Sequence, residues 1–142
     1  MDALDRKIMR LMVEGLSNSG IARTTARPLS TIQRRTKNLI KHGLIRQKYE
    51  IDYVKMGYRV GYVHVYVENG SVRQIAEKVR QVNGTETVTI HVGNSDIVAR
   101  YVCQSNTEIL SLLERLKHID GVAKVVWSEE VDTLPANQLA IV

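Results

Sequence analysis

Hydrogen-bond donors and positive charges gather on one side of a helix predicted at residues 29–42. On a helical wheel, Ile32, Thr36, Leu39 and Ile40 face inward. The opposite side carries, or is flanked by, seven polar residues: Ser30, Thr31, Gln33, Arg34, Lys37, Asn38 and Lys41. Ser, Thr, Gln and Arg can bind base edges in the major groove of DNA, and Lys can neutralise phosphate. The pattern predicts a DNA-contacting face; a helix whose polar side simply meets water is the alternative.

Two shorter helices are predicted ahead of this one, because apolar residues recur at helical spacing between capping residues. The first follows Asp2, stops at Gly15, and turns one apolar side inward: Leu4, Ile8, Leu11 and Met12. The second is capped by Ser17 or Asn18, runs to about residue 24, and turns Ile21 and Ala22 inward.

A four-residue break at residues 25–28 joins the second and third helices, so the pair fits a helix-turn-helix. Pro28 pre-organises the third helix but supplies no side-chain cap. Asn18 and Arg23, on the preceding helix, are placed to contact the sugar-phosphate backbone of DNA.

Charged residues are unevenly distributed along the chain. The 142 residues have a net charge of +5. Residues 1–50 hold 11 Lys and Arg against 4 Asp and Glu, which is +7, whereas residues 51–142 hold 9 against 11, which is −2. Six basic residues and no acid lie between Arg34 and Lys48. A basic unit of this size is typical of phosphate binding, so we expect double-stranded DNA as its partner.

Several function classes are excluded by what the sequence lacks. No apolar run approaches the ~20 residues of a membrane span, and no secretory signal begins the chain, so a cytoplasmic protein is expected. The single cysteine, Cys103, rules out an internal disulfide and a multi-cysteine zinc site. No two of the four histidines are paired at metal-ligand spacing, and catalytic motifs are absent. We therefore expect no enzyme activity, no metal and no cofactor.

From residue 60 the apolar period changes from that of a helix to two, which predicts strands. Strands are predicted at residues 60–67, 87–92, 97–103 and 122–131. Helices follow Ser71 and either Asn106 or Thr107, the second burying Ile109, Leu110, Leu112, Leu113 and Leu116. The order β-α-β-β-α-β predicts a ferredoxin-like domain whose sheet has one face uncovered, so self-association is expected. Residues 44–51 also have strand-like composition.

Short motifs at matching spacings make the chain resemble the Lrp/AsnC (feast/famine) transcriptional regulators of bacteria and archaea. They lie at residues 4–8 (Leu-Asp-Arg-Lys-Ile), 30–39, 43–45, 51–52, 55–58, 93–96, 121–124 and 131–133. Each motif is weak alone, but their order and spacing across almost the whole chain are specific.

The resemblance implies an α+β protein with an N-terminal winged helix-turn-helix and a C-terminal ferredoxin-like βαββαβ domain. Its parts are a DNA-binding domain at 1–50, a linker at 51–59, an effector and oligomerisation domain at 60–134, and a tail at 135–142. Family members form homodimers that often assemble into tetramers or octamers, and many bind an amino acid near a hairpin. Here that hairpin is Gly93, Asn94, Ser95 and Asp96. Its backbone amides can take a carboxylate and Asp96 an ammonium group.

Three departures from the family pattern stand out. The turn before the third helix is Ala26-Arg27-Pro28-Leu29 in place of Gly-Leu-Ser-Pro, the hairpin has Asn94-Ser95, and the last strand carries Trp127, expected at a subunit contact. Two other functions on this architecture remain open. Sirohaem decarboxylases also resemble the family, and His64 or His91 would then face a tetrapyrrole. An architectural protein would bind DNA without regard to sequence.

Overall fold

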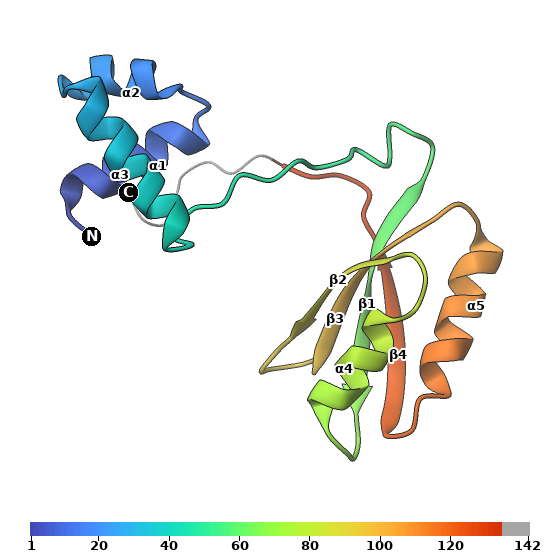
Figure 1. Cartoon of the computed structure of the whole chain (residues 1–142). Coiled ribbons are helices and arrows are strands. Elements are labelled where there is room, and N and C mark those ends of the chain that lie inside the picture. Colours follow the sequence, from blue (N-terminus) through green and yellow to red (C-terminus); the bar gives the residue numbers. More distant parts are fainter. Residues whose placement is uncertain (135–142) are drawn as a thin grey trace. The chain divides into compact units, whose positions relative to one another are not determined.

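The computed structural model describes residues 1–134, so the tail predicted at residues 135–142 lies outside the described part. Two compact units lie at Met1–Glu50 and Ile51–Thr133 (Figure 1). The first is helical; the second is a four-stranded sheet with two helices. Residues 51–59, predicted as a linker, group with the second unit.

The first unit consists of α1 (Ala3–Val13), α2 (Asn18–Thr25) and α3 (Leu29–Lys41). Asp2 caps α1 through a capping box with Asp5, and Ser17 rather than Asn18 caps α2. Pro28 precedes α3 without a side-chain cap, as predicted. The three helices share one small core, formed by Ile8, Met9, Leu11, Ile21, Ile32 and Leu39.

The second unit has the elements β1 (Arg59–Val67), α4 (Val72–Arg80), β2 (Thr85–Ile90), β3 (Ile97–Cys103), α5 (Asn106–Lys117) and β4 (Val122–Glu129). The antiparallel sheet has the order β2-β3-β1-β4. Alternate residues of β1 and β3, such as Val63, Val65, Ile97 and Ala99, pack with α4 and α5 on one face (Figure 1). The α+β fold with a ferredoxin-like order is therefore confirmed, and neither α4 nor α5 covers the other face.

Several local predictions are wrong. Residues 44–51 form no strand: Tyr49 is 94% exposed, and no described segment pairs with this stretch to supply the hydrogen bonds of a sheet. The first strand of the hairpin ends at Ile90 rather than at residue 92, because the pairing with β3 stops at Ile97. The cap of α5 is Ser105, whose hydroxyl accepts from the backbone N–H of Glu108.

Two apolar residues expected inside are exposed. Ile40 on α3 and Leu110 on α5 lie at the borders of their apolar stripes, and the neighbouring helices and strands leave them uncovered. Trp127, which was predicted at a subunit contact, is partly buried on the helix-covered face of the sheet. Its ring meets Tyr101 edge-on at 6.4 Å between centroids and fills the space that a side chain on Gly61 would need.

Candidate nucleic-acid interface

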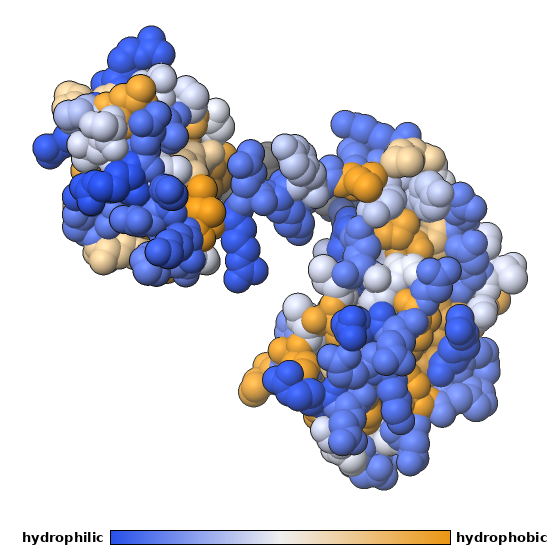
Figure 2. Space-filling view, in the orientation of Figure 1, coloured by the Kyte–Doolittle hydropathy of each residue, from blue (hydrophilic) through white to orange (hydrophobic). Residues whose placement is uncertain are grey.

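The outer side of α3 presents the polar residues that were predicted to contact DNA. Ser30, Gln33, Arg34, Lys37, Asn38 and Lys41 are exposed, and Thr31 is half-buried. Within the described residues, no ion pair neutralises the three cations of this set. The visible surface of this unit is largely hydrophilic (Figure 2). The side chains are thus free to meet phosphates and base edges.

The inner side of α3 explains why this outer face is so well separated. Ile32 and Leu39 are buried in the core of the unit, while Thr36 between them is 7% exposed and keeps a polar partner. The Thr36 hydroxyl donates to Asn18 Oδ1 at 3.2 Å, which ties α3 to α2. Asn18 was predicted to contact the DNA backbone, but its carbonyl oxygen is committed to this bond.

Arg35 also turns inward, away from the polar face. Its Nη1 atom donates to Asp2 Oδ2 at 2.7 Å and to Asp5 Oδ1 at 2.8 Å, which ties α3 to the first turn of α1. This contact, together with the backbone N–H of Asp5, lowers the pKa of Asp2 below its usual 3.8. The same two carboxylates raise the pKa of Arg35. Lys48 is also paired, with Glu50 at 3.2 Å, so four of the six basic residues between Arg34 and Lys48 have no ion pair among the described residues.

Two more arginines flank the entry to α3. Arg23 at the end of α2 and Arg27 in the turn are exposed and line one hollow together with Pro28. Neither α2 nor α3 has an acidic residue in its first turn, so the positive end of each helix dipole is not neutralised there. Arg27 was missed as a candidate contact, although a cation in the turn before a predicted recognition helix was the available signal.

The hairpin loop between β2 and β3 holds the four residues predicted to bind an effector. Gly93 adopts φ +138° with open space around it, and Asn94 is exposed. Ser95 is 9% exposed, and its hydroxyl lies 3.3 Å from His64 Nδ1. Asp96 Oδ2 accepts from the backbone N–H of Val67 at 2.8 Å, so one carboxylate oxygen already anchors the loop to β1.

The two histidines that a tetrapyrrole site would use do not share an environment. His64 lies on the uncovered face of β1, whereas His91 follows β2 and its Nε2 lies 2.7 Å from the Thr89 hydroxyl. Among the described residues, no group of three His, Cys, Asp or Glu side chains is arranged to hold a metal ion. None of the described helices combines the length and apolarity of a membrane span.

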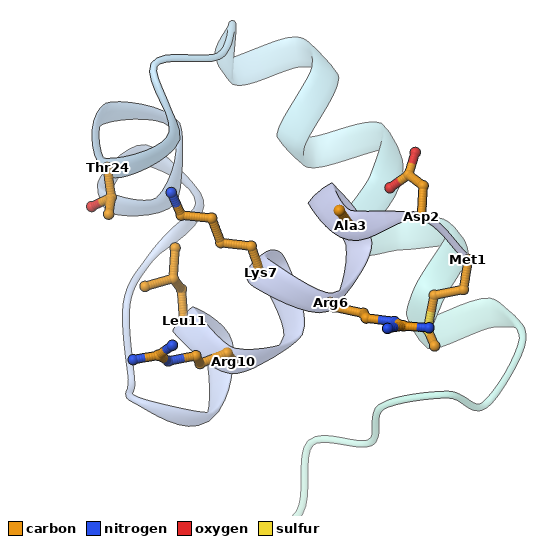
Figure 3. A pocket seen from close by; sticks show the side chains of 8 residues that line it. All are labelled: Met1, Asp2, Ala3, Arg6, Lys7, Arg10, Leu11 and Thr24. Carbon is orange, nitrogen blue, oxygen red and sulfur yellow. The ribbon is translucent and has the colours of Figure 1, made fainter. Parts of the chain in front are cut away.

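A hollow of about 720 Å³ lies along α1 and is walled mainly by that helix itself (Figure 3). Its lining combines an apolar floor with the cations Arg6, Lys7 and Arg10, and Lys7 extends toward Thr24 of α2. The carboxylate of Asp2 lies at one end, beside the ribbon of α3. The hollow adds positive charge to the unit, but no group of catalytic type converges there.

Comparisons with known proteins agree with this geometry. Residues 1–46 match the family model "Winged helix-turn-helix DNA-binding". An uncharacterized HTH-type transcriptional regulator of Pyrococcus furiosus is 35% identical over 127 residues, which are 86% of this chain and 86% of that protein.

Solved structures share the fold across both units. AsnC of E. coli has a TM-score of 0.80 at 16% identity, covering 98% of this chain and 97% of its own. A transcriptional regulator of Neisseria meningitidis, solved as a complex with L-Met, has a TM-score of 0.76 at 21% identity, covering 96% and 93%. The chain belongs to the HTH-type transcriptional regulators, and its fold is that of the AsnC-family structures.

Proposed function

We propose that the exposed face of α3 enters the major groove and gives this regulator its sequence specificity. The observation that carries the proposal is the separation of the helix into two sides: Ile32 and Leu39 are buried, and the opposite side holds free donors and cations. Ser30, Thr31, Gln33 and Arg34 lie in the first half of α3, the part that reaches base edges in helix-turn-helix proteins. Phosphates are then contacted by Lys37, Asn38 and Lys41. Arg23 at the end of α2 and Arg27 in the following turn also contact phosphates, and Asn18 can do so only through its amide nitrogen.

Selection of bound duplexes from a random pool tests this function. We expect a pseudo-palindromic site whose half-sites lie ~10 bp apart or a multiple of that, because a dimer presents two recognition helices. Arg34→Ala then lowers affinity for the selected site by about 1–3 kcal/mol and relaxes the base preference at one position. Lys117→Met, an exposed cation of α5, is the matched control and leaves both unchanged. Equal affinity for selected and random DNA favours an architectural protein instead.

The uncovered face of the sheet supports self-association as the second part of the proposal. Strand alternation places Tyr62, His64 and Tyr66 of β1 there, beside half-buried valines of β3 and β4. An aromatic and aliphatic face of this kind is suited to a second copy of the chain, giving a homodimer and, through further contacts, a tetramer or octamer. Sedimentation equilibrium tests it: Tyr62→Glu should shift the protein toward monomer without unfolding the sheet.

An amino-acid effector at the β2–β3 hairpin is the third part of the proposal. Ile90 and Val92 beside the loop are exposed, Gly93 leaves backbone amides accessible, and the second carboxylate oxygen of Asp96 is free to meet an ammonium group. The related Neisseria meningitidis regulator that binds L-Met makes methionine the first compound to titrate.

Asp96→Asn separates the effector role from the structural one. The amide oxygen can still accept from the Val67 N–H, but the negative charge for an ammonium group is gone. Calorimetric titration with each amino acid should show binding to the native chain and none to Asp96→Asn, at an unchanged melting temperature. Titrations without heat for every amino acid would reduce the hairpin to a structural turn.

A further inference from the structure

Arg35 differs from the other basic residues of α3 because it is paired with carboxylates of α1. Arg35 directly follows Arg34, yet only 25% of its side chain is exposed, and both hydrogens of one nitrogen are engaged by carboxylates of α1. Its Nε atom is buried and has no hydrogen-bond partner among the described residues. Burying a donor in this way costs free energy, so stability alone is a poor reason for its position.

The two carboxylates that hold Arg35 also hold each other. Asp2 Oδ1 accepts from the Asp5 N–H at 2.9 Å, and Asp5 Oδ2 accepts from the Asp2 N–H at 3.1 Å, so each acid caps α1 with one oxygen. Each then turns its other oxygen to the same Arg35 nitrogen. The capping box fixes both acids, and Arg35 therefore meets a preformed pair of acceptors rather than two freely moving side chains.

Thr36 makes a second tie of this kind on the adjacent side of the helix. It follows Arg35 and donates to Asn18 of α2, so two consecutive residues of α3 are bound to two different helices. Burial of Ile32 and Leu39 decides which side of α3 faces the core, and the directional hydrogen bonds of Arg35 and Thr36 further restrict its rotation. A rotation of α3 would carry Arg34 and the other outer residues away from their positions.

We propose that Arg35, held by Asp2 and Asp5, is a positioning residue that sets the rotation of α3 and thereby the sequence specificity of DNA binding, without itself contacting DNA. The inference rests on the proposed role of the α3 face. It assigns Asp2 and Asp5, the acids that cap α1, a part in base discrimination.

The test compares Arg35→Met with Arg34→Met at matched folded fraction, using specific and random duplexes over a range of salt. Each phosphate contact contributes about −0.9 to the slope of log affinity against log salt. Arg35→Met should keep the native slope and lose about tenfold in the ratio of specific to random affinity, the effect of one misplaced base contact. Arg34→Met removes a proposed base contact directly, so it should lower specific affinity and relax the base preference at one position.

Asp2→Asn with Asp5→Asn is the second variant, and it removes no cation. Asn is as good an N-cap as Asp, so α1 keeps its cap while the charged partners of Arg35 disappear. We expect tighter binding to random DNA, because two negative charges are lost, together with a fall in specific-to-random ratio that matches Arg35→Met. Arg35→Lys should restore part of the ratio, because an ammonium group can reach a carboxylate.

The outcomes separate the inference from the function it rests on. Native protein that does not discriminate between the duplexes overturns the proposed role of α3, and the inference with it. Native discrimination with a reduced salt slope in Arg35→Met shows that Arg35 binds phosphate, and an unchanged specific-to-random ratio in both variants shows that the ties do not set specificity. Either result overturns the inference alone.

Discussion

The two units of this protein stabilise themselves in different ways. The helical unit buries six apolar residues and adds polar ties between its helices, whereas the sheet unit buries thirteen residues in one continuous core. The first carries a charge of +7 and the second −2. A small core leaves the orientation of helices weakly specified, so directional hydrogen bonds add what apolar packing cannot. The larger core specifies its own sheet and leaves one face available for assembly.

The largest expected difference between the units is in how salt concentration changes their binding: DNA binding by the first unit and self-association of the second. If Arg23, Arg27, Lys37 and Lys41 of each protomer each neutralise one phosphate, the eight contacts of a dimer give a slope of about −7, and affinity falls about 10⁴-fold from 50 to 200 mM salt. Self-association through the sheet face buries apolar and aromatic surface and should change little over this range. Filter binding and sedimentation measured in the same buffers provide the two curves. If DNA binding and self-association depended on salt equally, the assignment of DNA binding to the charged helical unit and of assembly to the apolar sheet face would be contradicted.

The same Ile→Ala substitution should destabilise the unit with the small core to a greater extent than the unit with the large core. Ile32→Ala and Ile97→Ala each remove a fully buried side chain and should each cost about 2–5 kcal/mol. Because small cores provide little reserve, Ile32→Ala should unfold the helical unit near 37 °C, while Ile97→Ala lowers the melting temperature of a sheet unit that still folds. Calorimetry should resolve two transitions, each moved by its own variant. A single shared transition would show that the units unfold together.

A pair of backbone substitutions should act with opposite sign. Ala26 closes α2 at φ 51°, a conformation that favours glycine, so Ala26→Gly should stabilise the helical unit by about 0.5–1 kcal/mol. In the sheet unit, a Cβ on Gly61 would lie 2.5 Å from the Trp127 ring, so Gly61→Ala should cost about 1–3 kcal/mol. Urea unfolding monitored by circular dichroism and Trp127 fluorescence measures both. Destabilisation by Ala26→Gly would mean that the αL residue is not strained.

The smallest effect concerns pH, and the units should differ in their response to base. The pKa of Asp2 is lowered from 3.8 by Arg35, so its stabilisation is present above that pH and is lost as pH falls further. Burial raises the pKa of Cys103 above 9.0 and that of Tyr101 above 10.0, so their contribution is present below pH 9 and is lost as pH rises beyond it.

Thermal melts from pH 3 to pH 10 should therefore show weakening in base only for the sheet unit. Acid should weaken both units, because the pKa of Asp52 in the second unit is also lowered, chiefly by the backbone N–H of Lys55. Arg35→Met should remove the acid sensitivity that comes from Asp2; a helical unit that weakens in acid equally with and without Arg35 would place the origin of that weakening elsewhere.

The correct predictions of helix caps and of buried positions came mostly from residues close together in the sequence. Asp2, Ser17 and Ser71 cap their helices because short polar side chains satisfy free N–H groups nearby in sequence. The period of three to four placed Ile32 and Leu39 inside α3, and the period of two placed Val63 and Val65 inside the sheet. Each of these features depends on residues within one or two turns of each other.

Predictions that depended on distant neighbours were less accurate. Ile40 and Leu110 sit at the edges of apolar stripes, and only the packing of other elements decides whether such residues are covered. Trp127 is partly buried because Gly61, which lies 66 positions earlier, leaves room for its ring. Residues 44–51 have the composition of a strand, but a strand forms only where a partner supplies its hydrogen bonds.

The sequence by itself determined the division of charge, the order of elements and the polar side of the recognition helix, because these follow from local spacing and counting. Only the tertiary structure decided which arginine is free. Arg34 and Arg35 are chemically identical neighbours, yet Arg35 is taken up by carboxylates 30 and 33 positions away. Such a choice depends on where folding places α1 against α3, since a hydrogen bond requires contact that sequence spacing does not specify.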